Sequence, residues 1–111
     1  MTLKTLTDRE IQTIQKQANQ ARINILHMTT LAGSGHPGGS MSSIDILLTP
    51  YHMIKHDSKN PQMPDRDRVV VSNGHISPGV YSALGTMGYF DMDDAISEFR
   101  LAGSIFEGHI E

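Results

Sequence analysis

The chain has 111 residues, a formal net charge of −3, a hydrophobic fraction of 38% and no cysteine. This length fits at most one domain, and the slightly acidic balance gives no sign of a nucleic-acid or membrane-surface partner. Without cysteine there is no disulfide, thiolate nucleophile or sulfur metal site, which fits a reducing cytoplasm. No apolar run reaches the length of a signal peptide or a membrane span. The composition therefore predicts a small cytoplasmic protein.

The first predicted element is a long helix over about residues 8–30. Thr7 and Glu10 have the spacing of a capping box at its start. Behind them, apolar residues recur at three- and four-residue steps and form one stripe, namely Ile11, Ile14, Ala18, Ala21, Ile25 and Met28. Two glycines within the next few residues are expected to end this helix and to open a loop over residues 33–40.

A second helix is predicted over about residues 42–55, starting among the serines at its N-terminal end. Its buried face would carry Met41, Ile44, Leu48 and Tyr51. Pro50 lies inside this pattern, removes one backbone hydrogen bond and crowds the carbonyl four residues earlier. We therefore expect a kink near Ile46. The polar, proline-containing stretch 56–68 that follows is typical of a connecting loop.

A short strand is predicted at about residues 68–72. Val69, Val70 and Val71 form an unbroken β-branched run, which is typical of a strand buried on both faces of a parallel sheet. The run leads into a Ser-Asn-Gly-His loop ending at His75. Open parallel sheets bind ligands at the carboxyl ends of their strands, so this loop is a favourable place for a functional side chain.

Two further helices are predicted at about residues 77–88 and 92–101. Pro78 fits the first turn of one, Asp91 caps the other, and Gly103 is expected to stop it. Helices around one short parallel strand place the chain in the α/β class.

Three histidines each follow a glycine, namely His36, His75 and His109. Glycine lacks a Cβ, so the backbone can bring the next imidazole close to a bound molecule, and an imidazole exchanges protons near neutral pH. The glycines around His36 could also cradle a phosphate at a helix N-terminus. Plainer alternatives are an exposed histidine in a glycine-rich turn for His36, an Asn-Gly turn for His75 and a disordered terminal segment for His109. A triple-histidine zinc site is a further alternative, although the short paired spacing of common zinc motifs is absent.

Charged residues outside these loops have simpler interpretations. The alternating charges of residues 65–68 indicate a solvated turn held by ion pairs. Arg100 could bind an anion, but a surface arginine at a helix end is the simpler reading.

Three stretches together resemble the N-terminal part of transketolase, a family of thiamine-diphosphate enzymes. They are residues 33–39 (GSGHPGG), residues 65–75 (DRDRVVVSNGH) and residues 99–104 (FRLAGS) continuing to 108–111 (GHIE). Their order and separations fit the family, and the similarity runs from about Ala18 onward. The resemblance implies one partial domain over residues 1–111: the helix-rich start of a thiamine-diphosphate-binding domain of the pyrophosphate type, with a short parallel strand.

The resemblance also implies roles for the matching positions. His36 would move protons and contact the donor ketose near its carbonyl, and His109 would bind the donor's first hydroxyl. His75 would lie against the cofactor near its diphosphate side, and Gly39 would leave backbone room beside it. The reaction implied is a reversible two-carbon ketol transfer from a ketose phosphate to an aldose phosphate, with thiamine diphosphate as electron sink. No metal ligand is assigned within these residues.

Two departures from the family matter. The third stretch carries Ile105, Phe106 and Glu107 where the family has polar residues and proline, and Ile110 where it has proline, which bears on the orientation of His109. The 111 residues also contain neither the Gly-Asp-Gly motif that holds Mg²⁺ and the diphosphate nor the domain whose glutamate activates the aminopyrimidine. The resemblance therefore implies that the 111 residues are part of a subunit, either a truncated gene product, an extra split or a fragment. It also implies companion chains that supply both missing parts, an oligomeric enzyme and a chain that is inactive alone.

Two other functions stay open at this point. One is an enzyme similar to 1-deoxyxylulose-5-phosphate synthase, which shares the cofactor and the first Gly-His loop. The other is a non-catalytic assembly protein that uses the stripe of the first helix to bind a partner.

Overall fold

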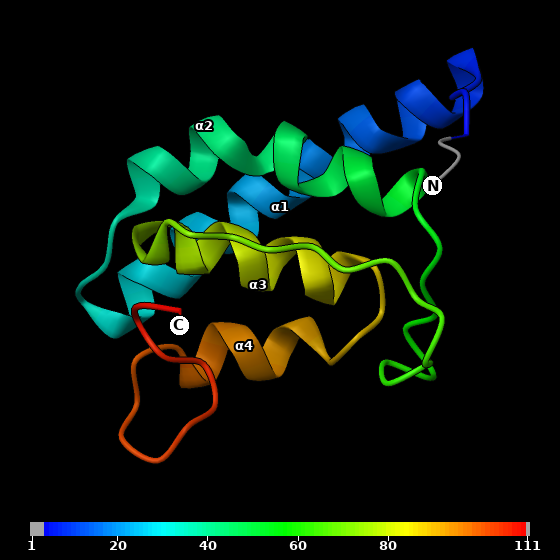
Figure 1. Ribbon diagram of the computed structural model, residues 1–111. Coiled ribbons are helices and arrows are strands. Elements are labelled where there is room, and N and C mark those ends of the chain that lie inside the picture. The colour runs from blue at the N-terminus through cyan, green and yellow to red at the C-terminus, as the bar shows by residue number, and fades with distance from the viewer. Residues whose placement is uncertain (1–3, 111) are drawn as a thin grey trace.

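The computed structural model describes residues 4–110, so Glu111, which ends the third transketolase-like stretch, lies outside the described part. The described residues form four α-helices and two short 3₁₀ helices (Figure 1). These elements are α1 (Asp8–Ala32), α2 (Pro37–Leu48), η1 (Thr49–His52), η2 (Gly74–Ile76), α3 (Ser77–Thr86) and α4 (Met92–Glu98). No strand forms between residues 4 and 110, so the helix-rich part of the α/β prediction is confirmed and the strand is not. None of the helices described is long and apolar enough to cross a bilayer.

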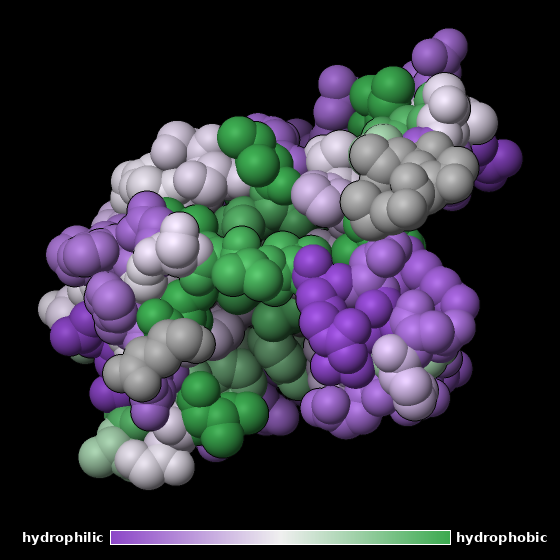
Figure 2. All heavy atoms as spheres, viewed as in Figure 1, coloured by the Kyte–Doolittle hydropathy of each residue, from purple (hydrophilic) through white to green (hydrophobic). Residues whose placement is uncertain are grey.

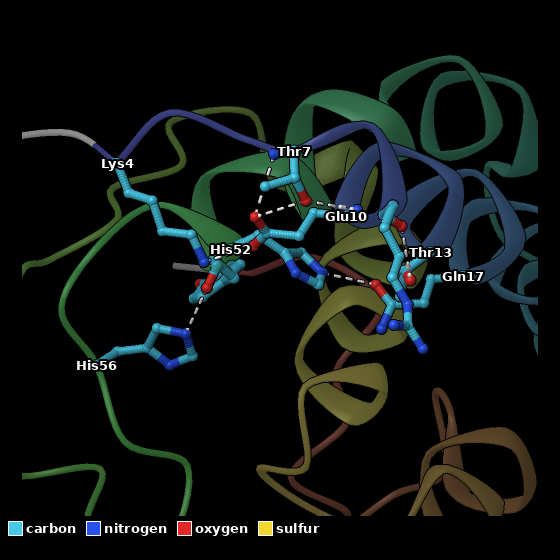
Figure 3. A network of polar contacts seen from close by, with 9 residues as sticks. Lys4, Thr7, Glu10, Thr13, Gln17, His52 and His56 are labelled. Atoms are coloured by element: carbon cyan, nitrogen blue, oxygen red, sulfur yellow. Dashed lines mark hydrogen bonds and ion pairs between the residues drawn. The ribbon is translucent and has the colours of Figure 1, made fainter.

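Helix α1 begins at the predicted capping box. The Thr7 hydroxyl accepts the backbone N–H of Glu10 at 3.2 Å, and the Glu10 carboxylate accepts the backbone N–H of Thr7 at 3.1 Å (Figure 3). The Lys4 ammonium pairs with the same carboxylate. These bonds, with that from Lys4 the largest contribution, lower the pKa of Glu10 to about 2. At the other end, Gly33 adopts φ 66° and ends the helix, as the sequence predicts.

The core lies where α1 packs against α2 and α3 (Figure 1). Its buried side chains are Ile14, Ala18, Ala21, Ile25, Ile44, Leu48 and Ala83. A second cluster joins α1, α3 and α4 to the C-terminal segment, through Met28, Tyr81, Ala95, Phe99 and Phe106. Ile11, predicted on the buried stripe, is 43% exposed, because the N-terminal turns of α1 extend beyond α3.

Helix α2 differs from its prediction at both ends. It begins at Pro37 rather than near residue 42, because a proline needs no N–H partner in a first helical turn. It ends at Leu48, and the chain continues as the 3₁₀ helix η1, with Pro50 in the first turn of that helix. The predicted kink near Ile46 is therefore wrong, since Pro50 ends the α-helix instead of bending it.

The segment predicted as a strand, residues 68–72, runs in front of α3 as a plain extended trace (Figure 1). No backbone group from residue 68 to 72 bonds to another backbone group of the described chain. Val70 is 88% exposed, so the predicted burial on both faces is not seen within the described residues. A strand needs neighbouring strands to bond its backbone, and residues 4–110 supply none.

The last helices are shorter than predicted. Helix α3 ends at Thr86, and α4 ends at Glu98, before the expected stop at Gly103. The end of α4 has a local cause. Phe99 leaves the helical conformation with φ −55° and ψ 124°, and Arg100 follows with φ 63°. Asp91 caps α4 as predicted, since its carboxylate accepts the N–H of Asp93 at 3.0 Å.

Candidate active site

The three loops that carry the Gly-His steps converge on one edge of the molecule. The ring of His75 lies 5.1 Å from the ring of His36 and 4.9 Å from the ring of His109, measured between centroids. Both contacts are edge to face, so the three imidazoles form a row with His75 in the middle. All three residues are exposed. The structure thus brings together every histidine that the sequence analysis singles out, and we call this set the histidine row.

Local turn chemistry places His75. The side-chain oxygen of Asn73 accepts the N–H of His75 at 3.2 Å and caps the 3₁₀ helix η2. Gly74 is buried in this turn, and a Cβ added there would overlap the ring of His109. The glycine of this Gly-His step therefore makes room for a neighbouring imidazole of the same chain.

His109 is held through the backbone of the residues before it. The hydroxyl of Ser77 donates to the carbonyl of Gly108 at 2.6 Å, and the hydroxyl of Tyr81 donates to the carbonyl of Glu107 at 2.7 Å. Burial, followed by the nearby Glu107 carboxylate, raises the pKa of Tyr81, so the phenol keeps the proton it donates. The described part of the C-terminal segment is thus bonded to the start of α3.

Phe106 anchors the same segment from the apolar side. Its ring lies 5.3 Å from that of Tyr81 and 4.9 Å from that of Phe90, edge to face in both cases, and the residue is 3% exposed. This position is one where the chain departs from the transketolase pattern. The departure places a large apolar side chain in the core, where it contributes to holding the His109 loop.

His36 stands immediately before α2, and its own side chain does not cap that helix. The preceding Gly35 has φ 129°, and a Cβ there would press on Thr29 and Phe99, so this glycine is required for space and conformation. Gly39 lies in the first turn of α2, where it is exposed and where a Cβ would only touch Ile76 at 3.4 Å. The surface of α2 beside His36 therefore has no side chain at that point.

Ser40 joins α2 to α3, which follow His36 and His75, and the sequence analysis gives it no part in the site. It is fully buried, and its hydroxyl accepts the N–H of Gly79 at 3.0 Å. Gly79 in turn leaves space for Ser40, because a Cβ there would lie 3.2 Å from the serine Cβ. No periodicity or spacing marks Ser40 and Gly79 as a pair, and small residues at a helix crossing are the only signal. Nothing in the sequence marks Ser77 and Tyr81 as the residues that bond the segment before His109.

Two histidines outside the row make structural bonds. His52 bonds to the side chain of Gln17 at 2.7 Å, and burial lowers its pKa (Figure 3). His56 bridges the hydroxyl of Tyr89 at 2.6 Å and the carbonyl of Tyr51 at 2.7 Å. These bonds tie η1 to α1 and to the segment after α3, which agrees with the absence of a functional pattern around them in the sequence.

No group of three or more histidine, aspartate or glutamate side chains between residues 4 and 110 is arranged to hold a metal ion. The histidine row therefore gives no support to the zinc alternative. Beside His109 the surface is hollowed into an open depression of about 560 Å³. Arg100, Ser104, Glu107 and Gly108 are among the residues that line it.

Comparison with known proteins gives the family. Residues 13–111 match the family described as transketolase, thiamine diphosphate binding domain. The chain is 36% identical over 99 residues to the 6-deoxy-6-sulfo-D-fructose transketolase subunit SqwG of Clostridium sp. (strain MSTE9), 40% identical over 98 residues to a transketolase of Buchnera aphidicola, and 32% identical over 101 residues to transketolase of Homo sapiens. These alignments cover 88%, 87% and 90% of this chain but 36%, 15% and 16% of the relatives. The chain belongs to the transketolase family and spans about a third or less of these relatives.

Proposed function

We propose that this chain is the N-terminal component of a transketolase, which reversibly transfers a two-carbon ketol unit from a ketose phosphate to an aldose phosphate. The observation that carries the proposal is the histidine row, in which three loops from distant parts of the sequence present adjacent imidazoles. Imidazoles suit this reaction because its proton transfers occur near neutral pH. The family match supports the proposal.

The residues present fit thiamine diphosphate. His36 and His75 precede α2 and α3, so the row lies beside two helix N-termini, whose free N–H groups favour a phosphate. The exposed Gly39 offers backbone without a side chain on the same surface, and His75 would lie against the cofactor. Bound thiamine diphosphate supplies the carbon nucleophile for the donor carbonyl and a ring that stores the resulting charge. We assign the Mg²⁺ ligands to transketolase sequence outside these 111 residues.

Each histidine then has its own task. His36 holds and moves a proton at the carbonyl oxygen of the donor ketose. His109 bonds the first hydroxyl of the donor, and the contact between its ring and that of His75 keeps it beside the reacting carbon. His75, in the middle of the row, links the cofactor side to the substrate side.

An apolar surface supports the need for further transketolase sequence. Hydrophobic atoms spread across the middle of the face shown in Figure 2, along the course of the extended segment. Val70 in the extended segment is 88% exposed, and Ile46 on α2 is 76% exposed. We propose that a companion chain, including the domain that binds the aminopyrimidine, covers this surface and pairs with residues 68–72 as a parallel strand. The assembled enzyme is an oligomer, and the absence of cysteine fits its location in the reducing cytoplasm.

Replacement of His75 by alanine in the assembled enzyme tests the proposal. We expect turnover of a ketose phosphate donor to fall by about 10²- to 10⁴-fold, the usual contribution of a proton-transferring side chain. His27→Ala is the matched control, because His27 is an exposed histidine on α1 outside the row, and it should leave turnover unchanged. Equal turnover in His75→Ala and wild type would contradict the proposal.

A further inference from the structure

Arg100 has an unusual backbone. Its φ is 63°, and no other residue apart from glycine has a positive φ between residues 4 and 110. Left-handed backbone is unfavourable for arginine because its Cβ crowds the following carbonyl, so such a residue persists only where its surroundings fix it.

The surroundings of Arg100 fix it from both sides. Phe99, immediately before it, is 1% exposed in the cluster between α1, α3 and α4. The N–H of Arg100 donates to the carbonyl of Phe106 at 2.9 Å, and Phe106 is buried in the same cluster. Residues 100–106 therefore form a loop closed by a backbone bond and anchored by two phenylalanines.

This conformation sends the arginine side chain across the backbone that precedes His109. A Cβ added to Gly108 would lie 2.6 Å from Nη1 of Arg100 and 3.0 Å from both its Cγ and its Cζ. The stem and guanidinium of Arg100 thus occupy the space that any side chain at position 108 would need. The glycine of this third Gly-His step makes room for an arginine, as Gly74 makes room for an imidazole.

The same stretch of backbone is also bonded to α3, through Ser77 to Gly108 and through Tyr81 to Glu107. Arg100 therefore covers Gly108 at a point where α3 also bonds this backbone. We infer that Arg100 is a positioning residue, which holds this backbone against α3 and so keeps the imidazole of His109 beside that of His75. Its consequence for catalysis rests on the proposed function, whereas the placement of the ring does not.

The test is the nuclear Overhauser contact between the ring protons of His75 and His109 in the full 111-residue chain, measured with the thermal midpoint. Arg100→Asn introduces a residue that tolerates left-handed backbone, but the asparagine side chain is too short to cover Gly108. We expect this variant to lose the contact between the two rings while the thermal midpoint stays near that of wild type. Arg100→Lys retains a long stem and should restore the contact in part.

Two further variants separate positioning from general loop stability. Gly103→Ala strains the same loop at φ 83° but meets no atom within 4 Å, so it should lower the thermal midpoint and keep the ring contact. Arg100→Gly removes the side chain and the backbone strain together, so it repeats the test if the asparagine variant unfolds. A ring contact that persists in Arg100→Asn or Arg100→Gly, or that is lost equally in Gly103→Ala, would overturn the inference. Because the measurement needs neither cofactor nor turnover, it stands apart from the test of the proposed function.

Discussion

The helical body and the extended segment of residues 68–72 are built from similarly apolar side chains and reach opposite states. Ile25 and Leu48 in the body are fully buried, whereas Val70 in the segment is 88% exposed. A helix bonds its own backbone and needs only side-chain packing from its neighbours. A strand needs backbone partners from other strands, and the described residues offer none. The helices therefore form within the described residues, whereas a strand at residues 68–72 would need backbone partners that residues 4–110 do not supply.

The histidine row belongs to the helical body. Its three loops are fixed by side chains of α3 and by the phenylalanine cluster, and none of their contacts needs the extended segment. The row therefore forms from contacts within residues 4–110.

The largest expected difference between the two regions is in stability. Ile25→Ala removes a fully buried side chain from the core and should lower the free energy of unfolding by about 2–5 kcal/mol. Val70→Ala should change the free energy of unfolding by less than about 0.5 kcal/mol, since the valine side chain has almost no buried surface. Chemical denaturation of both variants measures the two values. A Val70→Ala effect as large as that of Ile25→Ala would mean that the segment is already packed in the isolated chain.

The next prediction concerns turnover and a substitution that crowds the histidine row but leaves the helical core and the extended segment unchanged. Gly74→Ala places a methyl group against the His109 ring, which must move. Turnover of the assembled enzyme should fall by about 10²-fold, the loss that a misplacement of about 1 Å can cause. In a His109→Ala background the same substitution should have little further effect, because the ring it displaces is gone. Additive losses in the double variant would show that the alanine acts elsewhere.

A smaller loss of stability is expected when the capping box at the start of α1 is removed. Thr7→Ala removes half of the capping box and should cost about 1 kcal/mol of unfolding free energy in the isolated chain. Thermal denaturation of the two chains measures the difference. No change would indicate that the first turn of α1 contributes nothing to the fold.

The smallest expected effect is a pH dependence of stability, which comes from Glu10 in the same capping box. The pKa of Glu10 is about 2 in the folded chain against an ordinary 4.5, so its contribution to stability is present above about pH 4.5 and is lost as the pH falls toward 2. The difference in thermal midpoint between wild type and Glu10→Gln should therefore shrink over that range. Because the group is exposed, the difference should also shrink in high salt. A difference that stays constant from pH 6 to 2 would contradict this assignment.

The sequence predicts the helices well where local rules decide them. The capping box at Thr7, the stop at Gly33 and the cap at Asp91 follow from residue type and spacing alone, and all three are confirmed. Some helix ends are misplaced for local reasons, since α2 begins already at Pro37 and α4 ends at Glu98. The larger failures come where the outcome depends on distant residues. Ile11 is exposed because α1 extends beyond its neighbours, and Val70 is exposed because residues 4–110 place no strand beside it.

The site divides in the same way. The three histidines are found from their Gly-His steps, and the structure brings them together. The sequence does not show why two of these positions need glycine. Gly74 faces His109, which is distant in the sequence, and Gly108 faces Arg100, whose backbone is strained. Arg100 itself resembles an ordinary surface arginine until its φ of 63° is known.

We propose that the histidine row is one side of a thiamine-diphosphate site completed by other transketolase sequence. Calorimetric titration of thiamine diphosphate with Mg²⁺ tests it most directly, using the chain alone and the chain mixed with a relative's polypeptide that lacks the region matched by residues 13–111. We expect binding only in the mixture, and weaker binding when the chain carries His75→Ala. Equal binding by the chain alone, or no binding in a mixture that forms a stable complex, would contradict the account.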